Sequence, residues 1–198
     1  MSKYRFVVLF FALVVTSITA EEISIGSIDC LNNGLEEIQL ELFYNSDSES
    51  LILYDSREFT LAYIFNEEAR FLLLKAITKV EEWKDIAVTN NINQMNKEVP
   101  DIDDVNIITF ANYGDGWFEV GNLINYQFLI MEYNNEIRYL FLIRTRSVDD
   151  LNNSSFGTAY SFDVGDSSDI LKYAFSDEML EQYKEVVRKK SSTSDLFD

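Results

Sequence analysis

Two stretches in the first third of the chain place an apolar residue at every second position, and this pattern limits the possible folds most. Residues 37–44 read EIQLELFY and residues 59–65 read FTLAYIF. Successive side chains of a strand point to opposite faces, so a period of two indicates strands with one buried face. With the polar loop at 45–50 and the apolar stretch at 51–56 between them, they predict an antiparallel meander.

The period changes directly after the meander. Asn66 suits a helix N-cap, and Glu67 and Glu68 would place negative charge in the first turn. The apolar residues that follow are one, three or four positions apart: Leu72, Leu73, Ala76, Val80, Trp83 and Ala87. This spacing predicts one long amphipathic helix over 67–87, ending near Asn90 and Asn91.

Strand patterns return in the second half of the chain. We predict strands over 105–110, 123–133, 137–146 and 157–164, then a helix that begins near Ser168 and a helix capped by Ser176. Residues 92–104 have no assignment, because Pro100 disfavours a helix there. The predicted class is α+β, a mainly antiparallel sheet of meander and hairpins packed with one long amphipathic helix and a C-terminal helix.

The hairpin over 123–143 carries apolar residues on both faces. Ile124, Tyr126, Phe128 and Ile130 share one face, and Leu129, Met131, Leu140 and Leu142 share the other. A sheet with one solvated face alternates more cleanly, so we expect both faces to be covered here. The 67–87 helix can cover one. The C-terminal helix, the meander or a partner molecule can cover the other, and the last option leaves a self-associating structural protein open.

Residues 1–20 have the composition of a secretory signal. Lys3 and Arg5 precede an apolar run from Phe6 to Val15, and small or polar residues lead to Ala20. As a helix, 6–20 would span roughly 22 Å, less than the ~30 Å of a bilayer core, although an uncleaved anchor stays an alternative. We expect export to the periplasm or the outside, a single domain over 21–190, a loose tail over 191–198, and no membrane span after cleavage.

The chain is strongly acidic. Its formal charge is −18, and the leader holds two cations and no acid, so the remainder carries −18 − 2 = −20. Such a field repels nucleic acid and favours a cationic ligand, whether a protein or a small molecule. Solubility alone can also account for this charge. The oligomeric state is left open.

Histidine is absent, which excludes His-activated nucleophiles and the most common zinc ligand. Cys30 is the single cysteine, and we expect a small buried residue or a free thiol. No cofactor motif occurs, so no cofactor is predicted. Three acidic stretches, at 45–50, 101–104 and 163–169, invite comparison with calcium loops. The first lacks the glycine and the bidentate acid of such a loop, and each is better explained as a solvated loop, so no metal site is predicted.

The stretch NYGDGWFEVGN at 112–122 holds the tightest turn signal in the chain. Its aromatic and acidic residues make a candidate contact surface: Tyr113, Asp115, Trp117 and Glu119. These aromatics can also simply pack on the sheet. We therefore expect an exported, non-enzymatic binding module. The alternative is a carboxylate-dependent hydrolase of cell-envelope or extracellular polysaccharide, with Asp115 and Glu119 as its paired acids.

Overall fold

The computed structural model describes residues 22–57, 60–100, 102, 105–112, 114–147 and 158–194, so the predicted leader lies outside it. The strands are β1 (Glu22–Leu31), β2 (Glu37–Asn45), β3 (Ser50–Asp55), β4 (Thr60–Phe65), β5 (Met95–Glu98), β6 (Val105–Asn112), β7 (Trp117–Tyr133), β8 (Glu136–Ser147) and β9 (Ala159–Asp163). The helices are α2 (Glu67–Thr89), α3 (Ser167–Ala174) and α4 (Asp177–Ser194). The predicted α+β class with an antiparallel sheet is confirmed.

The sheet curls until its two ends meet. Eight strands pair in the order β1-β2-β3-β4-β6-β7-β8-β9, and β9 returns to β1, while β5 extends the edge of β7. The pairings are antiparallel, as short loops between consecutive strands require. The closing seam is thin. β1 pairs with β2 at nine positions, but in the described part of the chain it pairs with β9 at Leu31 and Ser161 alone.

β1 and β5 have no counterpart among the strands predicted from the sequence. In β1 the register against β2 shifts between Ser24 and Gly26, where Gly26 has φ +145°. This bulge adds a residue between Ile23 and Ile28 and interrupts the period of two. The sequence pattern therefore does not predict a strand at β1. β5 has only four residues, MNKE, which carry no alternation to detect.

The helices begin where the sequence indicates. The Asn66 side chain accepts a hydrogen bond from the N–H of Ala69 at 2.9 Å, and α2 follows to Thr89. Ser176 Oγ accepts from the N–H of Met179 at 3.3 Å ahead of α4, which continues to Ser194, into the stretch expected to be loose. In the described residues, none of these helices is both long and apolar enough to cross a bilayer.

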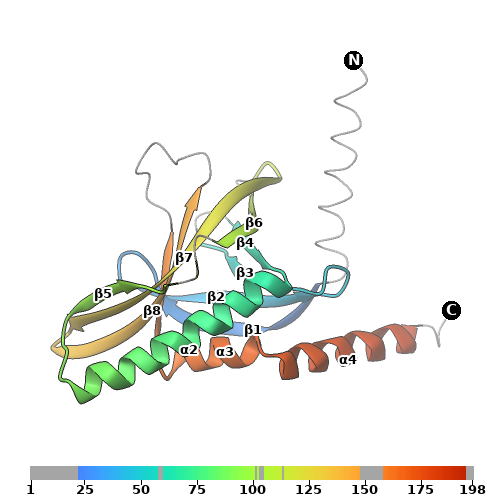
Figure 1. Cartoon of the computed structure of the whole chain (residues 1–198). Helices are drawn as coiled ribbons and strands as arrows, with labels where there is room; N and C mark the ends of the chain where they lie inside the picture. The colour runs from blue at the N-terminus through green and yellow to red at the C-terminus, as the bar shows by residue number, and fades with distance from the viewer. Residues whose placement is uncertain are drawn as a thin grey trace.

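The main core lies between the sheet and the helices. In Figure 1, α2 crosses in front of the sheet, and α3 and α4 follow below it, with the end of α4 extending past the strands. The Trp83 ring of α2 lies 6.1 Å from that of Phe128, so α2 covers one face of the β7–β8 hairpin, as expected. On the other face Leu140 and Leu142 are buried and Leu129 and Met131 are half-buried, so the middle of this hairpin is covered on both sides, as expected.

A polar group is built into the interior at the end of β3. The Asp55 carboxylate is 3 % exposed and accepts hydrogen bonds from Arg57 at 2.6 and 2.8 Å and from the Tyr160 hydroxyl at 2.8 Å. The Tyr63 hydroxyl lies 3.1 Å from that of Tyr160 and donates to it, because the Tyr160 proton is directed at the carboxylate. Tyr160 thus links β9 to β3 and β4 through the interior.

This network favours the ionised form of Asp55. Burial alone would raise the pKa of Asp55, but the hydrogen bonds from Arg57 and Tyr160 outweigh it and lower that pKa. A lowered pKa adds stability above the ordinary carboxyl pKa of about 3.9, and this stability is lost as the pH falls through the folded-state value.

Replacing Tyr160 by Phe tests the link through the interior. Tyr160→Phe removes a hydrogen bond to a buried carboxylate, so we expect the free energy of unfolding at pH 7 to fall by about 2 kcal/mol in urea titrations. Tyr139→Phe, at a half-buried position on β8, is the matched control and should change it by less than about 0.5 kcal/mol. Equal effects of the two variants would contradict this role of Tyr160.

Candidate functional site

Of the candidate residues, Asp115 lies in the turn between β6 and β7, and Trp117 and Glu119 lie at the start of β7. Gly114 and Gly116 adopt φ +97° and +130°, and the Asn112 side chain accepts from the N–H of Gly114 at 2.8 Å. Asp115 and Glu119 are exposed, and Tyr113 lies outside the described residues. The turn therefore does present carboxylates to solvent.

Trp117 is less available than the sequence suggests. Its ring is half-buried and meets the edge of the Tyr54 ring at 6.1 Å. Both belong to a second apolar cluster on the face of the sheet opposite the helices. The buried members are Ile52, Tyr54, Ala62 and Phe110, with Phe43, Ile64 and Trp117 packed against them. Packing on the sheet accounts for much of this side chain's surface.

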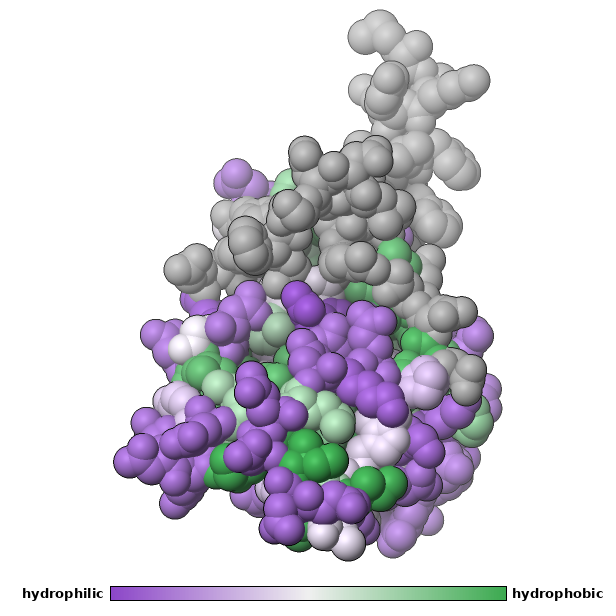
Figure 2. All heavy atoms as spheres, turned by 60° about the vertical axis from the view of Figure 1, so that its left-hand side comes forward, coloured by the Kyte–Doolittle hydropathy of each residue, from purple (hydrophilic) through white to green (hydrophobic). Residues whose placement is uncertain are grey.

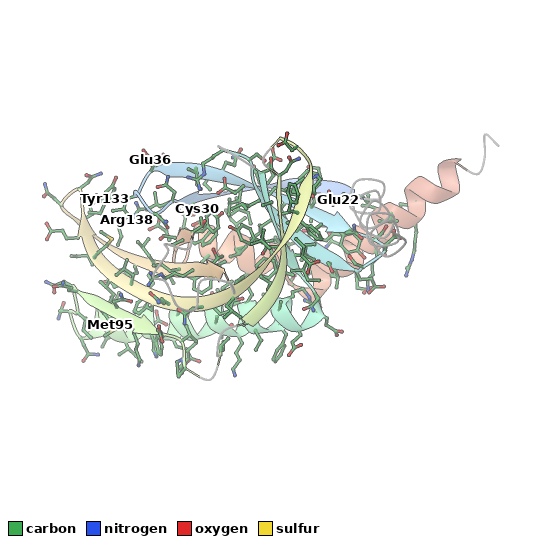
Figure 3. The ribbon with its side chains drawn as sticks, turned by 90° about the horizontal axis from the view of Figure 1, so that it is seen from above. Glu22, Cys30, Glu36, Met95, Tyr133 and Arg138 are labelled. Atoms are coloured by element: carbon green, nitrogen blue, oxygen red, sulfur yellow. The ribbon has the colours of Figure 1, made fainter. Side chains whose placement is uncertain are left out.

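A carboxyl group with a raised pKa lies beside the same cluster. The Tyr54 hydroxyl donates to both oxygens of Glu22, at 3.0 and 2.9 Å. Burial raises the pKa of Glu22, and the bond from Tyr54 opposes this only in part. In Figure 3 Glu22 lies at the opposite end of the sheet from Glu36, Tyr133 and Arg138, with Cys30 between them. Neither Glu22 nor Tyr54 lines the groove described next.

Alanine substitutions on β7 separate packing from surface contact. Trp117→Ala should lower the free energy of unfolding by about 2 kcal/mol, since it removes a half-buried aromatic side chain. Phe118→Ala, the neighbouring residue that is 50 % exposed, should lower it by less than about 1 kcal/mol. Urea unfolding of both variants measures this difference. If Trp117→Ala leaves the free energy of unfolding unchanged, the Trp117 ring is available for binding instead.

A groove of about 510 Å³ opens where β1 and β9 separate. On one side of the Leu31–Ser161 pair the seam stays closed, because the N–H of Ala159 donates to the Asn33 side chain at 2.5 Å. On the other side the strands diverge. The groove is lined by Asp29, Cys30, Leu31, Glu37, Ile38, Gln39, Arg138, Ser161, Asp163, Asp166 and Ser167.

The groove is acidic. Its lining holds four carboxylates, from Asp29, Glu37, Asp163 and Asp166, against the single guanidinium of Arg138. Arg138 is already engaged, because its Nε donates to Asp163 at 3.0 Å and its Nη2 donates to the other oxygen of that carboxylate. Asp29 accepts from the Gln39 amide at 3.0 Å. The lining therefore has an excess of three negative charges, which favours a cationic ligand.

A second hollow of about 450 Å³ adjoins the groove and shares Glu37, Arg138 and Asp163 with it. It lies beside the β7–β8 turn, where Arg138 stacks 5.7 Å from the Tyr133 ring. The Lys84 ammonium donates to the carbonyl of Val164 at 2.5 Å at its inner side. Figure 2, which brings the side with β5 forward, shows mostly polar residues with small separate apolar patches.

Cys30 lines the groove but is only 6 % exposed, which confirms the expected buried free thiol. Burial, reinforced by the nearby Asp55 charge, raises the pKa of Cys30 to about 12. The thiol is therefore neutral at physiological pH and a poor nucleophile. Its place in the groove is that of a small apolar surface.

In the described residues, side chains of the stretches compared with calcium loops accept hydrogen bonds from nearby backbone N–H groups. The Asn45 side chain accepts from the N–H groups of Asp47 and Ser48, at 3.1 and 3.0 Å. Ser167 and Ser168 accept from the N–H groups of Asp163 and Gly165, at 2.9 and 3.1 Å. Asp101, Asp103 and Asp104 lie outside the described residues.

Comparisons of the chain with protein-family models, with curated proteins and with solved structures found no match. The arrangement of the described residues is therefore the only guide to its chemistry. The groove combines excess negative charge, an unreactive thiol and a strand edge, which together suit reversible binding of a cationic group.

Proposed function

We propose that this chain is an exported, non-enzymatic binding module that holds a cationic ligand in the groove between β1 and β9. The observation that carries the proposal is the opening of the closed sheet at one place, into a hollow with an excess of three negative charges. Binding clefts are concave and carry a few convergent polar groups, as this one does. Export is supported by the cationic start and the apolar run of residues 1–20.

The volume suits a small molecule or a short stretch of peptide. At about 510 Å³ the groove lies within the range of ligand pockets, roughly 300–1,000 Å³. Its walls come from β1, β2, β8, β9 and the start of α3, so bound ligand would bridge both sides of the open seam. A ligand held by charge alone would bind weakly at high salt, because exposed carboxylates are screened.

A titration with trilysine tests the proposal. The amide signals of Leu31 and Ser161 should shift in NMR spectra of the protein without its leader, and triglutamate at the same concentration should leave them unchanged. Combining Glu37→Gln with Asp166→Asn removes two groove charges and should weaken trilysine binding on the order of tenfold, about 1.4 kcal/mol.

The matched control makes the same charge change on the turn predicted from the sequence. Asp115→Asn combined with Glu119→Gln should leave trilysine affinity within about twofold, a difference of about 0.4 kcal/mol. Loss of binding in this control, with binding retained in the groove variant, would place the contact surface on the β6–β7 turn instead. Polysaccharide turnover that Glu119→Gln alone abolishes would support the hydrolase.

A further inference from the structure

We propose that the outer edge of β1, from Ser27 to Asp29, accepts one extended peptide from a partner, and that this peptide alternates basic and apolar residues. The inference rests on the proposed function, because it names the ligand class of the same groove. Strand addition to an open sheet edge is a common mode of peptide recognition, in which the backbone supplies affinity and alternate side chains supply specificity.

The direction of the backbone groups in β1 follows from its turn into β2. The N–H of Asn32 donates to the carbonyl of Glu36 at 3.0 Å, so the backbone N–H of Asn32 is directed towards β2. The backbone groups of successive residues point to alternate sides of a strand. The N–H and C=O groups of Ile28 and Cys30 are therefore directed towards β2, and those of Ser27 and Asp29 are directed outwards. Leu31 points outwards too and meets Ser161. Within the described chain, Ser27 and Asp29 have no strand partner on that side.

β9 cannot continue along this edge. Its last residue, Asp163, donates its N–H to Ser167 Oγ at 2.9 Å, and the chain turns into α3. In the described part of the chain, the outward N–H and C=O groups of Ser27 and Asp29 are left without a strand partner, and natural sheets usually pair, cover or distort such an edge. Here the distortion begins only at the bulge between Ser24 and Gly26. The stretch from Ser27 to Asp29 stays regular, so its outward backbone groups are able to pair.

One face of this edge selects basic residues. Ser27, Asp29 and Leu31 stand opposite Glu41, Gln39 and Glu37 in the β1–β2 register, so all six side chains lie on the same face. Asp29, Glu37 and Glu41 are exposed there. A strand added beside β1 would place every second side chain next to these three carboxylates, where Lys or Arg is favoured.

The opposite face selects apolar residues. Ile28 and Cys30 are buried on that face, and α3 packs against β1. Cys30 also lines the groove, so the side chains of an added strand that point to this face meet an apolar surface.

Charge argues against a second copy of this chain as the occupant. Two copies without the leader would bring two formal charges of −18 − 2 = −20 together and would place the carboxylates of one β1 against those of the other. Like charges across paired strands are destabilising. A peptide with basic residues reverses this effect, so a partner of opposite charge fits the edge.

A labelled heptapeptide of alternating lysine and valine, Lys-Val-Lys-Val-Lys-Val-Lys, tests the proposal by fluorescence anisotropy with the full protein lacking its leader. We expect it to bind, and a peptide of the same composition with its four lysines ahead of its three valines to bind at least on the order of tenfold more weakly, because strand addition requires alternation. Equal binding of the two peptides would overturn the proposal, since only charge would then matter.

Ser27→Pro removes one outward N–H and leaves the ladder to β2 intact, since proline is tolerated where a strand N–H faces solvent. We expect it to weaken the alternating peptide about tenfold, whereas the matched control Ser27→Ala keeps the N–H and should bind like the wild type. Slowed amide exchange of Asp29 in the wild-type complex provides a readout that does not depend on the proline variant folding.

The outcomes separate this inference from the proposed function. If trilysine shifts the groove signals but the alternating peptide neither binds better than its permuted form nor protects Asp29, strand addition is wrong and the groove still binds cations. If neither ligand binds, both proposals are wrong. If β1 is protected in concentrated protein without peptide, and the protein is a dimer by sedimentation, the edge belongs to a second copy.

Discussion

The hydrogen bond from Tyr160 to Asp55 holds β9 against β3 and β4 through the interior of the sheet. The backbone seam between β9 and β1 is one residue pair in the described chain, so side-chain contacts must supply most of the closure. Tyr63 completes the link by donating to Tyr160, and its ring lies 5.6 Å from that of Tyr160 in an edge contact. Arg57 supplies the counter-charge that makes a buried carboxylate acceptable.

Closure by side chains leaves the backbone of β1 available. A sheet closed by a full ladder would use the outward groups of Ser27 and Asp29, and no groove would exist there. Because the link is inside the sheet and the groove is outside it, the two do not compete for the same atoms. Stability and binding can therefore belong to neighbouring residues of one strand: Cys30 is buried in the core and only borders the groove, and Asp29 is exposed in the groove.

The sequence predicted those parts of the fold that depend on local periodicity. The caps and apolar stripe of α2 and the hairpin turns of β7–β8 depend on residues close together in the chain, and each was found where expected. Cys30 was predicted to be buried or free and is both. The α+β class followed from the switch between periods of two and 3.6 residues.

The candidate site could not be predicted from local periodicity. The sequence does not predict β1, because the bulge at Gly26 interrupts its alternation. The groove depends on the pairing of Leu31 with Ser161, two residues that are distant in the sequence. Asp29, Glu37 and Asp163 look like ordinary surface acids until that pairing brings them together. The sequence predicts Trp117 as a contact residue because an aromatic side chain follows a tight turn, but its contact with Tyr54 is a long-range property that no local pattern reveals.

The alternation of backbone directions in β1 is the most direct point at which to examine this account. Hydrogen–deuterium exchange of the ligand-free protein, followed residue by residue by NMR, measures it. We expect the amides of Ile28 and Cys30 to be protected by their bonds to β2 and those of Ser27 and Asp29 to exchange at least on the order of a hundredfold faster. Uniform protection of all four amides would show that the outer edge of β1 is already occupied, and would contradict the account.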